Sequence, residues 1–277
     1  MDLQTFAKLL TAIDEEGPKS LKHKELLNPE SFALRIGITG PPGAGKSTLI
    51  SGLIQQFRNN QLQVGVLAID PSSPFSFGAL LGDRIRYHEA LQDEKVFVRS
   101  IGTRGSLGGL SASAYLMLRA FDFAKFDVVI IETVGVGQTE LEIMNVADLT
   151  TVVLVPESGD GIQLMKAGLM EIADLFVVNK ADRPGAQSLI DEIKNEMSVL
   201  EKDREVFATV ATNKQGIEDL ANYLILNINN QELKSKRTTK EKLKAEAKSL
   251  LRTTFEKTIE KKVTQIKTTK DILKSLK

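Results

Sequence analysis

Residues 36–48 read Ile36-Gly-Ile-Thr-Gly40-Pro-Pro-Gly-Ala-Gly45-Lys46-Ser47-Thr48, and they contain the most informative motif of the chain. It matches the pattern G-x-x-x-x-G-K-S and lies between an apolar, strand-like run over residues 34–39 and a helical pattern over residues 48–57. The pattern in this context is typical of a phosphate-binding loop. We therefore expect a nucleotide site here, rather than an ordinary glycine-rich turn.

Each residue type in this loop has a chemical reason. Glycines let the backbone curl so that several N–H groups point at one anion, and the following helix directs its positive end at the same anion. Lys46 is placed to reach the β- and γ-phosphates as a catalytic residue, and the Ser47 hydroxyl to bind a magnesium ion. The nucleotide-binding residues expected here are Gly40, Pro42, Gly43, Ala44, Gly45, Lys46, Ser47 and Thr48.

A second motif, Asn179-Lys180-Ala181-Asp182, follows another apolar run. Downstream of a phosphate-binding loop it points to guanine, because the Asp182 carboxylate can accept hydrogen bonds from the guanine N1–H and exocyclic amine. Adenine has no such donor pair, so the motif favours GTP over ATP. Asn179 would tie this motif to the phosphate side, and the Lys180 stem would cover the base. A helix cap at a strand end is the alternative interpretation.

Several residues after other predicted strands are candidates for the same site. Backbone N–H groups near Val210, Ala211 and Thr212 can meet the guanine O6, although this segment alone is uninformative.

Acidic residues also follow two predicted strands at the same sheet edge. Glu132 can hold the magnesium shell, and Gly135 can give its N–H to the γ-phosphate. Asp70 is a second candidate for the metal or the hydrolytic water, with an ordinary Asp-Pro turn as the alternative. Asp83 is a further candidate, which a helix cap explains almost as well.

Two features bear on switching. Val136, not Gln, directly follows Gly135, and Gln138 comes two residues later, so the sequence does not indicate a mechanism in which Gln orients the attacking water. The segment 156–166 contains Asp160 and Lys166, a charged pair that can change partners. Taken alone, that segment reads as a loop and the start of a helix.

Composition limits the other possibilities. The chain has 277 residues, 42% of them hydrophobic, which suffices for one sizeable α/β domain with appendages or for two small domains. Lys and Arg together number 36, and Asp and Glu together also number 36. This balance does not indicate a polyanionic partner, so no nucleic-acid partner is expected. The charge is uneven, because residues 231–277 hold 15 basic and 6 acidic side chains. This basic tail fits a solvated helix face, an acidic partner or self-association.

The residue types present also limit which metal sites and disulfides the chain can form and where in the cell it is expected. The chain has no Cys, which excludes a disulfide framework and a thiolate metal site, and His23 and His88 stand alone. No apolar run approaches the roughly 18 residues that a membrane span needs, so no membrane partner is expected. The first 16 residues carry four acidic side chains, unlike a secretory signal or a transit peptide. We expect a cytoplasmic protein.

Strand-like and helix-like patterns alternate along most of the chain. After the first strand, strands are predicted over residues 64–69, 96–101, 128–132, 151–155, 176–179 and 206–210. Helices are predicted between or after them, over residues 79–91, 111–124, 161–172, 186–200 and 217–230. The alternation indicates an α/β P-loop NTPase with a doubly wound, mostly parallel sheet.

Helical extensions are expected before and after this sheet region in the sequence. An amphipathic pattern near the N-terminus ends at Gly17, and a long one runs from about 239 to 270 without Gly or Pro. The long helix would either pack back on its own domain or make a dimer contact. The predicted divisions are residues 1–30 (N-terminal helical extension), 31–230 (P-loop GTPase domain) and 231–277 (C-terminal helical extension).

Seven segments together resemble the MeaB/ArgK family of GTPases associated with methylmalonyl-CoA mutase. In chain order they are GITGPPGAGKSTL, AIDPSSPFSFGALLGDRIR, RGSLGGLSA, IETVGVGQTE, VPESGDGIQLMKAG, NKAD and TVATNKQGI. The likeness covers residues 30–225, and the fourth and fifth segments are its most specific parts.

The resemblance implies a Mg²⁺-dependent GTPase that acts as a chaperone for an adenosylcobalamin-dependent acyl-CoA mutase, gating cofactor loading and protecting the mutase. It implies that Asp70, Asp83 and Glu132 surround the magnesium ion and the hydrolytic water, and that Lys166 is the signalling residue of a switch loop. Members are commonly homodimers joined by terminal helical extensions, and here the N-terminal extension is short.

Two other function classes remain as alternatives. A GTPase that inserts nickel into an enzyme would usually carry Cys or His clusters. A small-molecule kinase would need an acceptor pocket and would usually favour ATP, against which the N-K-A-D motif argues.

Overall fold

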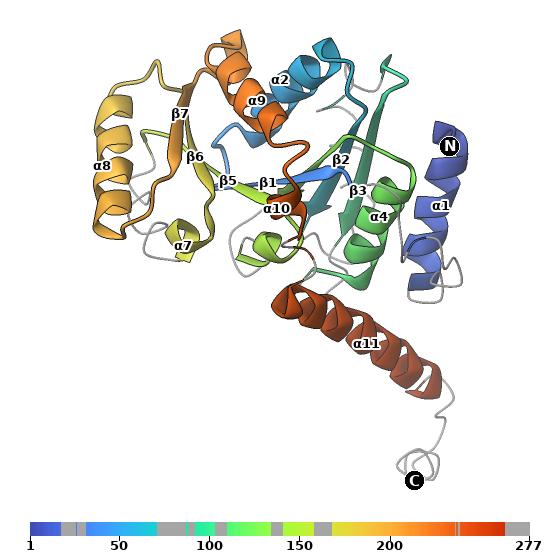
Figure 1. The fold of residues 1–277 in the computed structure, drawn as a ribbon. Helices are drawn as coiled ribbons and strands as arrows, with labels where there is room; N and C mark the ends of the chain where they lie inside the picture. The colour runs from blue at the N-terminus through green and yellow to red at the C-terminus, as the bar shows by residue number, and fades with distance from the viewer. Residues whose placement is uncertain are drawn as a thin grey trace.

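The computed structural model shows a sheet with helices packed around it (Figure 1). The residues described are 1–17, 26, 32–70, 87, 92–102, 110–133, 141–157, 168–235, 237 and 239–263. The predicted helix over residues 79–91, apart from residue 87, and most of the one over residues 161–172 lie outside them.

Seven parallel strands form the sheet, in the spatial order β3-β2-β4-β1-β5-β6-β7. They are β1 (Leu34–Thr39), β2 (Val64–Asp70), β3 (Val96–Gly102), β4 (Val128–Thr133), β5 (Leu149–Leu154), β6 (Leu175–Asn179) and β7 (Glu205–Thr209). Every residue of β1, β4, β5 and β6 is buried, which explains their nearly continuous apolar sequences. The predicted fold class is confirmed.

Helices cover both faces of the sheet. They are α1 (Leu3–Glu16), α2 (Lys46–Asn59), α4 (Ala112–Phe123), α7 (Met170–Ile172), α8 (Ala186–Val199), α9 (Ile217–Leu226), α10 (Gln231–Ser235) and α11 (Lys240–Val263), with short 3-10 turns at Ile143–Asn145 and Ala211–Asn213.

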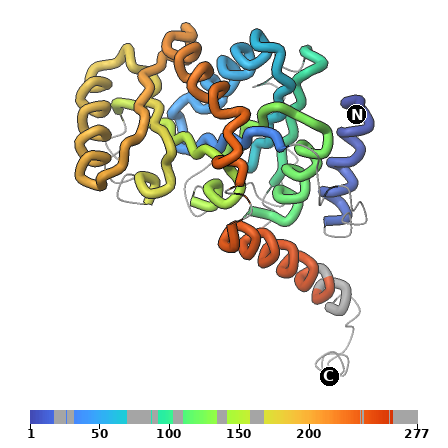
Figure 2. Tube along the Cα trace, viewed as in Figure 1, coloured from blue at the N-terminus to red at the C-terminus, as the bar shows by residue number. Residues whose placement is uncertain are grey.

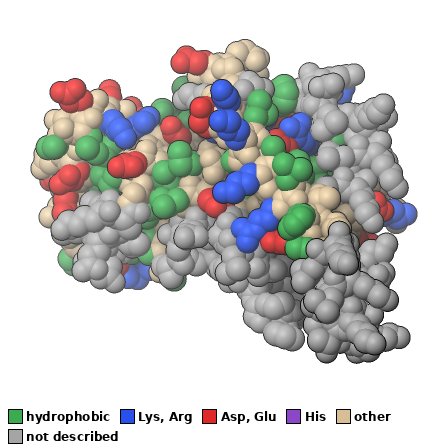
Figure 3. Space-filling view, turned by 90° about the horizontal axis from the view of Figure 1, so that it is seen from below, with side chains coloured by type: hydrophobic (Ala, Val, Ile, Leu, Met, Phe, Trp, Pro, Cys, Tyr) green, Lys and Arg blue, Asp and Glu red, His purple; other side chains and the backbone are tan. Residues whose placement is uncertain are grey.

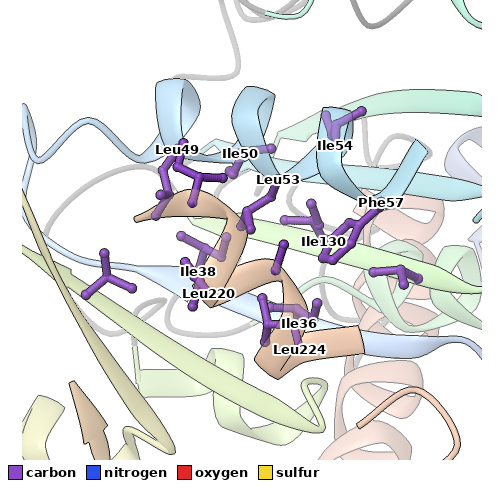
Figure 4. Packing of buried hydrophobic residues seen from close by; sticks show 14 of the residues in the cluster. Ile36, Ile38, Leu49, Ile50, Leu53, Ile54, Phe57, Ile130, Leu220 and Leu224 are labelled. Carbon is purple, nitrogen blue, oxygen red and sulfur yellow. The ribbon is translucent and has the colours of Figure 1, made fainter. Parts of the chain in front are cut away.

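Alternate side chains of each strand point to opposite faces, so each face has its own core. On one face α2 and α9 pack together over the central strands, where Ile36 and Ile38 meet Leu53 and Leu220 (Figure 4). On the other face α1 and α4 lie side by side (Figure 2), and the ring centroids of Phe6 and Phe121 are 5.0 Å apart. Helix α8 covers β5 and β6 on that same face.

Local chemistry explains where α1 begins and ends. The Asp2 carboxylate accepts a hydrogen bond from the Thr5 N–H at 2.9 Å, which caps the first turn. The helix ends at Gly17, whose φ of 61° lies in the left-handed region that glycine adopts readily.

The segment after α10 is anchored beneath the sheet, at the amino ends of β1 and β5. The Arg237 Nε donates to Asp148 Oδ1 at 2.6 Å, and its Nη1 lies 3.4 Å from Asp122 Oδ1. Arg35 pairs with the same Asp122 at 2.5 Å. Two arginines and two aspartates thus form a buried, charge-balanced cluster, which we call the basal ion cluster.

Helix α11 contacts α4, and polar side chains make part of this contact. Arg119 of α4 makes two hydrogen bonds with Glu246, at 2.6 and 2.8 Å, and Ser249 donates to the Leu110 carbonyl at 2.8 Å. Large apolar side chains on α11 remain exposed, namely Leu243, Leu251, Phe255 and Ile259. Seen from below, the coloured part of the molecule shows basic, acidic and apolar side chains intermixed (Figure 3). Of the described helices, none is both long and apolar enough to cross a bilayer.

Candidate functional site

The loop between β1 and α2 needs glycine at two positions. Gly40 has a φ of 142°, and a Cβ there would lie 2.1 Å from the Val153 carbonyl oxygen. Gly45, with a φ of 85°, directly precedes α2 as its N-cap, and a Cβ there would lie 2.4 Å from the Asn179 amide nitrogen. The loop therefore packs its backbone directly against β5 and the end of β6, which leaves its opposite side for an anion.

Lys46 lies inside the curve of this loop. Its side-chain amine donates to the carbonyls of Gly40 at 2.7 Å and Pro41 at 3.0 Å, and the residue is only 7% exposed. These two bonds fix the ammonium charge beside the N-terminus of α2. Both features favour the binding of a phosphate group at this point.

Ser47, Glu132 and Tyr87 form a hydrogen-bonded chain next to the loop. The Ser47 hydroxyl donates to Glu132 Oε1 at 2.8 Å, and the Tyr87 hydroxyl donates to Glu132 Oε2 at 2.5 Å. Glu132 and Tyr87 are each 1% exposed. A hydroxyl and a carboxylate oxygen in contact are the kind of oxygen donors that magnesium prefers. The residues present therefore fit the predicted metal.

Asn179 connects the phosphate loop to the predicted base-binding loop. Its amide nitrogen donates to the Ala44 carbonyl at 2.8 Å. Its amide oxygen accepts hydrogen bonds from the Thr209 hydroxyl and the Ala211 N–H, both at 3.1 Å. One buried side chain thus joins the phosphate loop to the segment after β7.

The other residues of the base motif lie beyond the end of β6 and are at least partly exposed to solvent. Lys180 adopts a left-handed φ of 57°, and Asp182 is exposed. Beside it the exposed Arg183 pairs with Glu157, and the hydrogen bond from Arg183 lowers the pKa of that carboxyl below its ordinary value. An exposed Asp182 is accessible to an incoming base.

The described residues cover only part of the predicted site. The structure brings the phosphate loop, Glu132 and Asn179 together at the carboxyl ends of β1, β4 and β6. Val210, Ala211 and Thr212 follow β7 at the same edge, and Ala211 alone of the three bonds to Asn179. Asp70 ends β2, but its side chain is outside the described part. The remaining candidates, which lie wholly outside it, are Asp83, Gly135, Gln138, Asp160 and Lys166.

Sequence reasoning missed Tyr87 and Thr209. Thr209 pairs with Asn179 in the register of β6 and β7, so a hydroxyl at the end of the neighbouring strand was an available signal. Tyr87 bonds to a residue 45 positions away, and nothing in its local sequence indicates that contact.

Comparison with known proteins identifies related chains. A family model described as "Methylmalonyl Co-A mutase-associated GTPase MeaB" matches residues 6–268. Over 228 residues the chain is 46% identical to a Pyrococcus abyssi protein named provisionally as a GTPase, covering 79% of this chain and 70% of that protein. Over 192 residues it is 40% identical to a fused isobutyryl-CoA mutase of Cupriavidus metallidurans, covering 67% of this chain but 17% of that protein.

Solved structures share the fold. The crystal structure of a LAO/AO transport system kinase is 25% identical, with a TM-score of 0.67, and the match covers 95% of this chain and 82% of that one. HypB from Helicobacter pylori, solved in complex with nickel, is 18% identical with a TM-score of 0.56, covering 79% of this chain and 96% of that one. The second likeness shows the fold alone.

Proposed function

Because this chain belongs to the MeaB family of methylmalonyl-CoA mutase-associated GTPases, we propose that its GTP hydrolysis requires magnesium and serves an adenosylcobalamin-dependent acyl-CoA mutase. The mutase would be of the methylmalonyl-CoA type. The name of the fused isobutyryl-CoA mutase, in which a related segment occurs within a mutase chain, supports this kind of partner.

The observation that carries the magnesium part is the contact between the Ser47 hydroxyl and the buried Glu132 carboxylate. With GTP in the loop, Lys46 would meet negative charge that grows on the β- and γ-phosphates during hydrolysis. Magnesium would neutralise further phosphate charge, held by Ser47 with Glu132, Asp70 and Asp83 around it. Gly135 would add an N–H donor, and the proposed base contacts are those of Asp182, Lys180 and the backbone of residues 210–212.

The regulatory part of the proposal rests on the family. The protein would gate cofactor loading and protect the mutase as a chaperone, in the cytoplasm and as a homodimer. Asp160 and Lys166 would be the switch pair, and Gln138 would take part in the same coupling. The exposed apolar side chains of α11 are a suitable surface for the dimer contact. The proposed division into residues 1–30, 31–230 and 231–277 assigns that contact to the C-terminal extension.

The first experiment tests whether the protein prefers GTP to ATP and whether it hydrolyses GTP without a phosphate acceptor. We expect calorimetric titration with Mg²⁺ to give GTP an affinity about 10⁴-fold above that of ATP, because the Asp182 contact has no counterpart in adenine. Phosphate release from GTP without any acceptor would exclude a small-molecule kinase, the second candidate function, which the likeness to a transport system kinase suggests. Equal affinity for ATP and GTP would contradict the assignment of the base site. The nickel-insertion alternative has only the shared fold in its favour.

The second experiment tests the partner. GTP turnover would be measured with and without methylmalonyl-CoA, isobutyryl-CoA and ethylmalonyl-CoA mutases, and one of them should raise it. In Lys166→Ala, GTP binding should persist while stimulation and cobalamin transfer are lost, since coupling needs contacts that differ between two states. Lys194→Ala is the control, because Lys194 is an exposed lysine on α8. Turnover that no mutase changes would refute the chaperone role.

A further inference from the structure

The Glu132 carboxylate is held at both of its oxygens. Ser47 donates to Oε1 at 2.8 Å and Tyr87 to Oε2 at 2.5 Å. The last torsion of a Glu side chain has broad, roughly two-fold preferences, so one hydrogen bond leaves the carboxylate free to rotate. The Tyr87 hydroxyl removes that freedom, because its ring is packed within the core on the α2 face of the sheet.

The same chain of hydrogen bonds orients the Ser47 hydroxyl. A serine hydroxyl has one proton to donate and two lone pairs to accept with. The proton of Ser47 is directed at Glu132, so the direction of the lone pairs depends on where the Glu132 carboxylate stands. That position depends in turn on Tyr87.

Tyrosine suits this task for an electrostatic reason. A phenol donates a hydrogen bond without bringing a positive charge, whereas an Arg or Lys at this position would neutralise the carboxylate. Glu132 is therefore fixed in place by a neutral donor, so Tyr87 brings no positive charge that would repel a cation. Outer partners of this kind, which orient a residue that binds a metal, commonly affect metal affinity by about 10- to 100-fold.

We propose that Tyr87 is a positioning residue for the divalent cation that accompanies the nucleotide, acting through Glu132 on Ser47. The inference rests on the proposed magnesium requirement. The role assigned to Tyr87 does not depend on the acidic candidates Asp70 and Asp83. Tyr87 itself does not contact the nucleotide or the metal.

The test is Tyr87→Phe, which removes one oxygen atom and retains the packed ring. Affinity for a fluorescent, non-hydrolysable GTP analogue would be measured in EDTA and across a magnesium titration. We expect unchanged affinity in EDTA and about a tenfold or greater rise in the magnesium concentration for half-maximal effect. Turnover at saturating magnesium should return toward that of the parent. The control is Tyr115→Phe, since Tyr115 is 7% exposed and belongs to the core on the opposite face of the sheet.

The possible outcomes distinguish a failure of this inference from a failure of the proposed magnesium requirement. If magnesium does not change the nucleotide affinity of the parent protein, both the magnesium requirement and this inference are overturned. A parent that responds to magnesium, with Tyr87→Phe responding identically, would overturn only the role of Tyr87. Equal loss of affinity in EDTA and in magnesium would also overturn it, because it would show a structural role alone. A thermal melt of each variant verifies folding.

Discussion

Replacing Arg237 by Ala should destabilise the folded protein more than any exposed charge deletion. Arg237 belongs to the basal ion cluster, where its side chain is 8% exposed and that of Asp148 is 0% exposed. Burial alone lowers the pKa of the Arg237 guanidinium, but hydrogen bonds and attraction from Asp148 outweigh it and raise that pKa above its ordinary value. The arginine is therefore charged, and its removal leaves the cluster with one uncompensated negative charge.

The magnitude follows from the partners left behind. Asp148 loses the 2.6 Å bond to its Oδ1 and the Arg237 contact to its Oδ2, while Oδ2 keeps the Arg35 N–H at 2.8 Å. The Ala33 carbonyl also loses its bond to Arg237. Removing one partner of a buried ion pair costs about 3–5 kcal/mol. With a urea slope of about 2–3 kcal/mol/M, the midpoint of unfolding should fall by roughly 1–2.5 M.

Urea unfolding without nucleotide, followed by circular dichroism, measures this. The matched control is Arg252→Ala on α11, whose exposed pair with Glu256 lies at 2.8 Å. An exposed pair contributes about 0–1 kcal/mol, so the control midpoint should hardly move. If Arg237→Ala costs less than about 1 kcal/mol, the charge balance assigned to the basal ion cluster is wrong.

Three further results are expected. In Lys46→Ala, GTP turnover should drop by about 100-fold or more in a steady-state assay, with an unchanged circular dichroism spectrum; parent-level turnover would show that the phosphate site is elsewhere. Asn179→Ala leaves the Ala44 carbonyl, the Thr209 hydroxyl and the Ala211 N–H without this partner. The free energy of unfolding in urea should therefore fall by at least about 2 kcal/mol, and titration should show a weaker affinity for GDP. If neither changes, other groups join the two loops. Burial raises the pKa of Tyr115, with help from the nearby charges of Glu142 and Glu246, and burial also raises the pKa of Tyr223. Above about pH 10 the unfolded chain therefore loses these phenol protons before the folded protein does, so the free energy of unfolding should fall as pH rises. Tyrosinate absorbance that reaches its full value before the protein unfolds would contradict this.

Much of the fold was predictable because β1, β4, β5 and β6 are buried along their whole length, which makes their sequences largely apolar. Apolar runs located six strands after β1 to within two residues, and the largest error was β5, which begins at Leu149 instead of Thr151. Thr150 and Thr151 read as polar in the sequence, yet they are 2% and 1% exposed in the structure. Threonine tolerates burial within a strand because its branched side chain fits the pleated surface.

The site was predictable where function depends on local spacing, and unpredictable where it depends on distant contacts. Lys46, Ser47 and Asn179 lie in motifs whose geometry is set within a few residues. Tyr87 and Arg237 instead act on partners far along the chain, Glu132 and Asp148. Neither contact can be read from periodicity or composition, because each depends on how separate elements pack.

The strand order has a consequence for synthesis and folding. The central strand β1 is hydrogen-bonded to β4 on one side and to β5 on the other, and β5 ends at Leu154, 115 residues after Thr39 ends β1. At about 5–20 residues per second of translation, β1 is without that second neighbour for about 6–23 s. Such long-range pairing is slow to form and exposes apolar surface meanwhile. GTP can therefore stabilise a growing chain only after its first half has been made, although the loop that binds the phosphates is among the earliest segments to emerge.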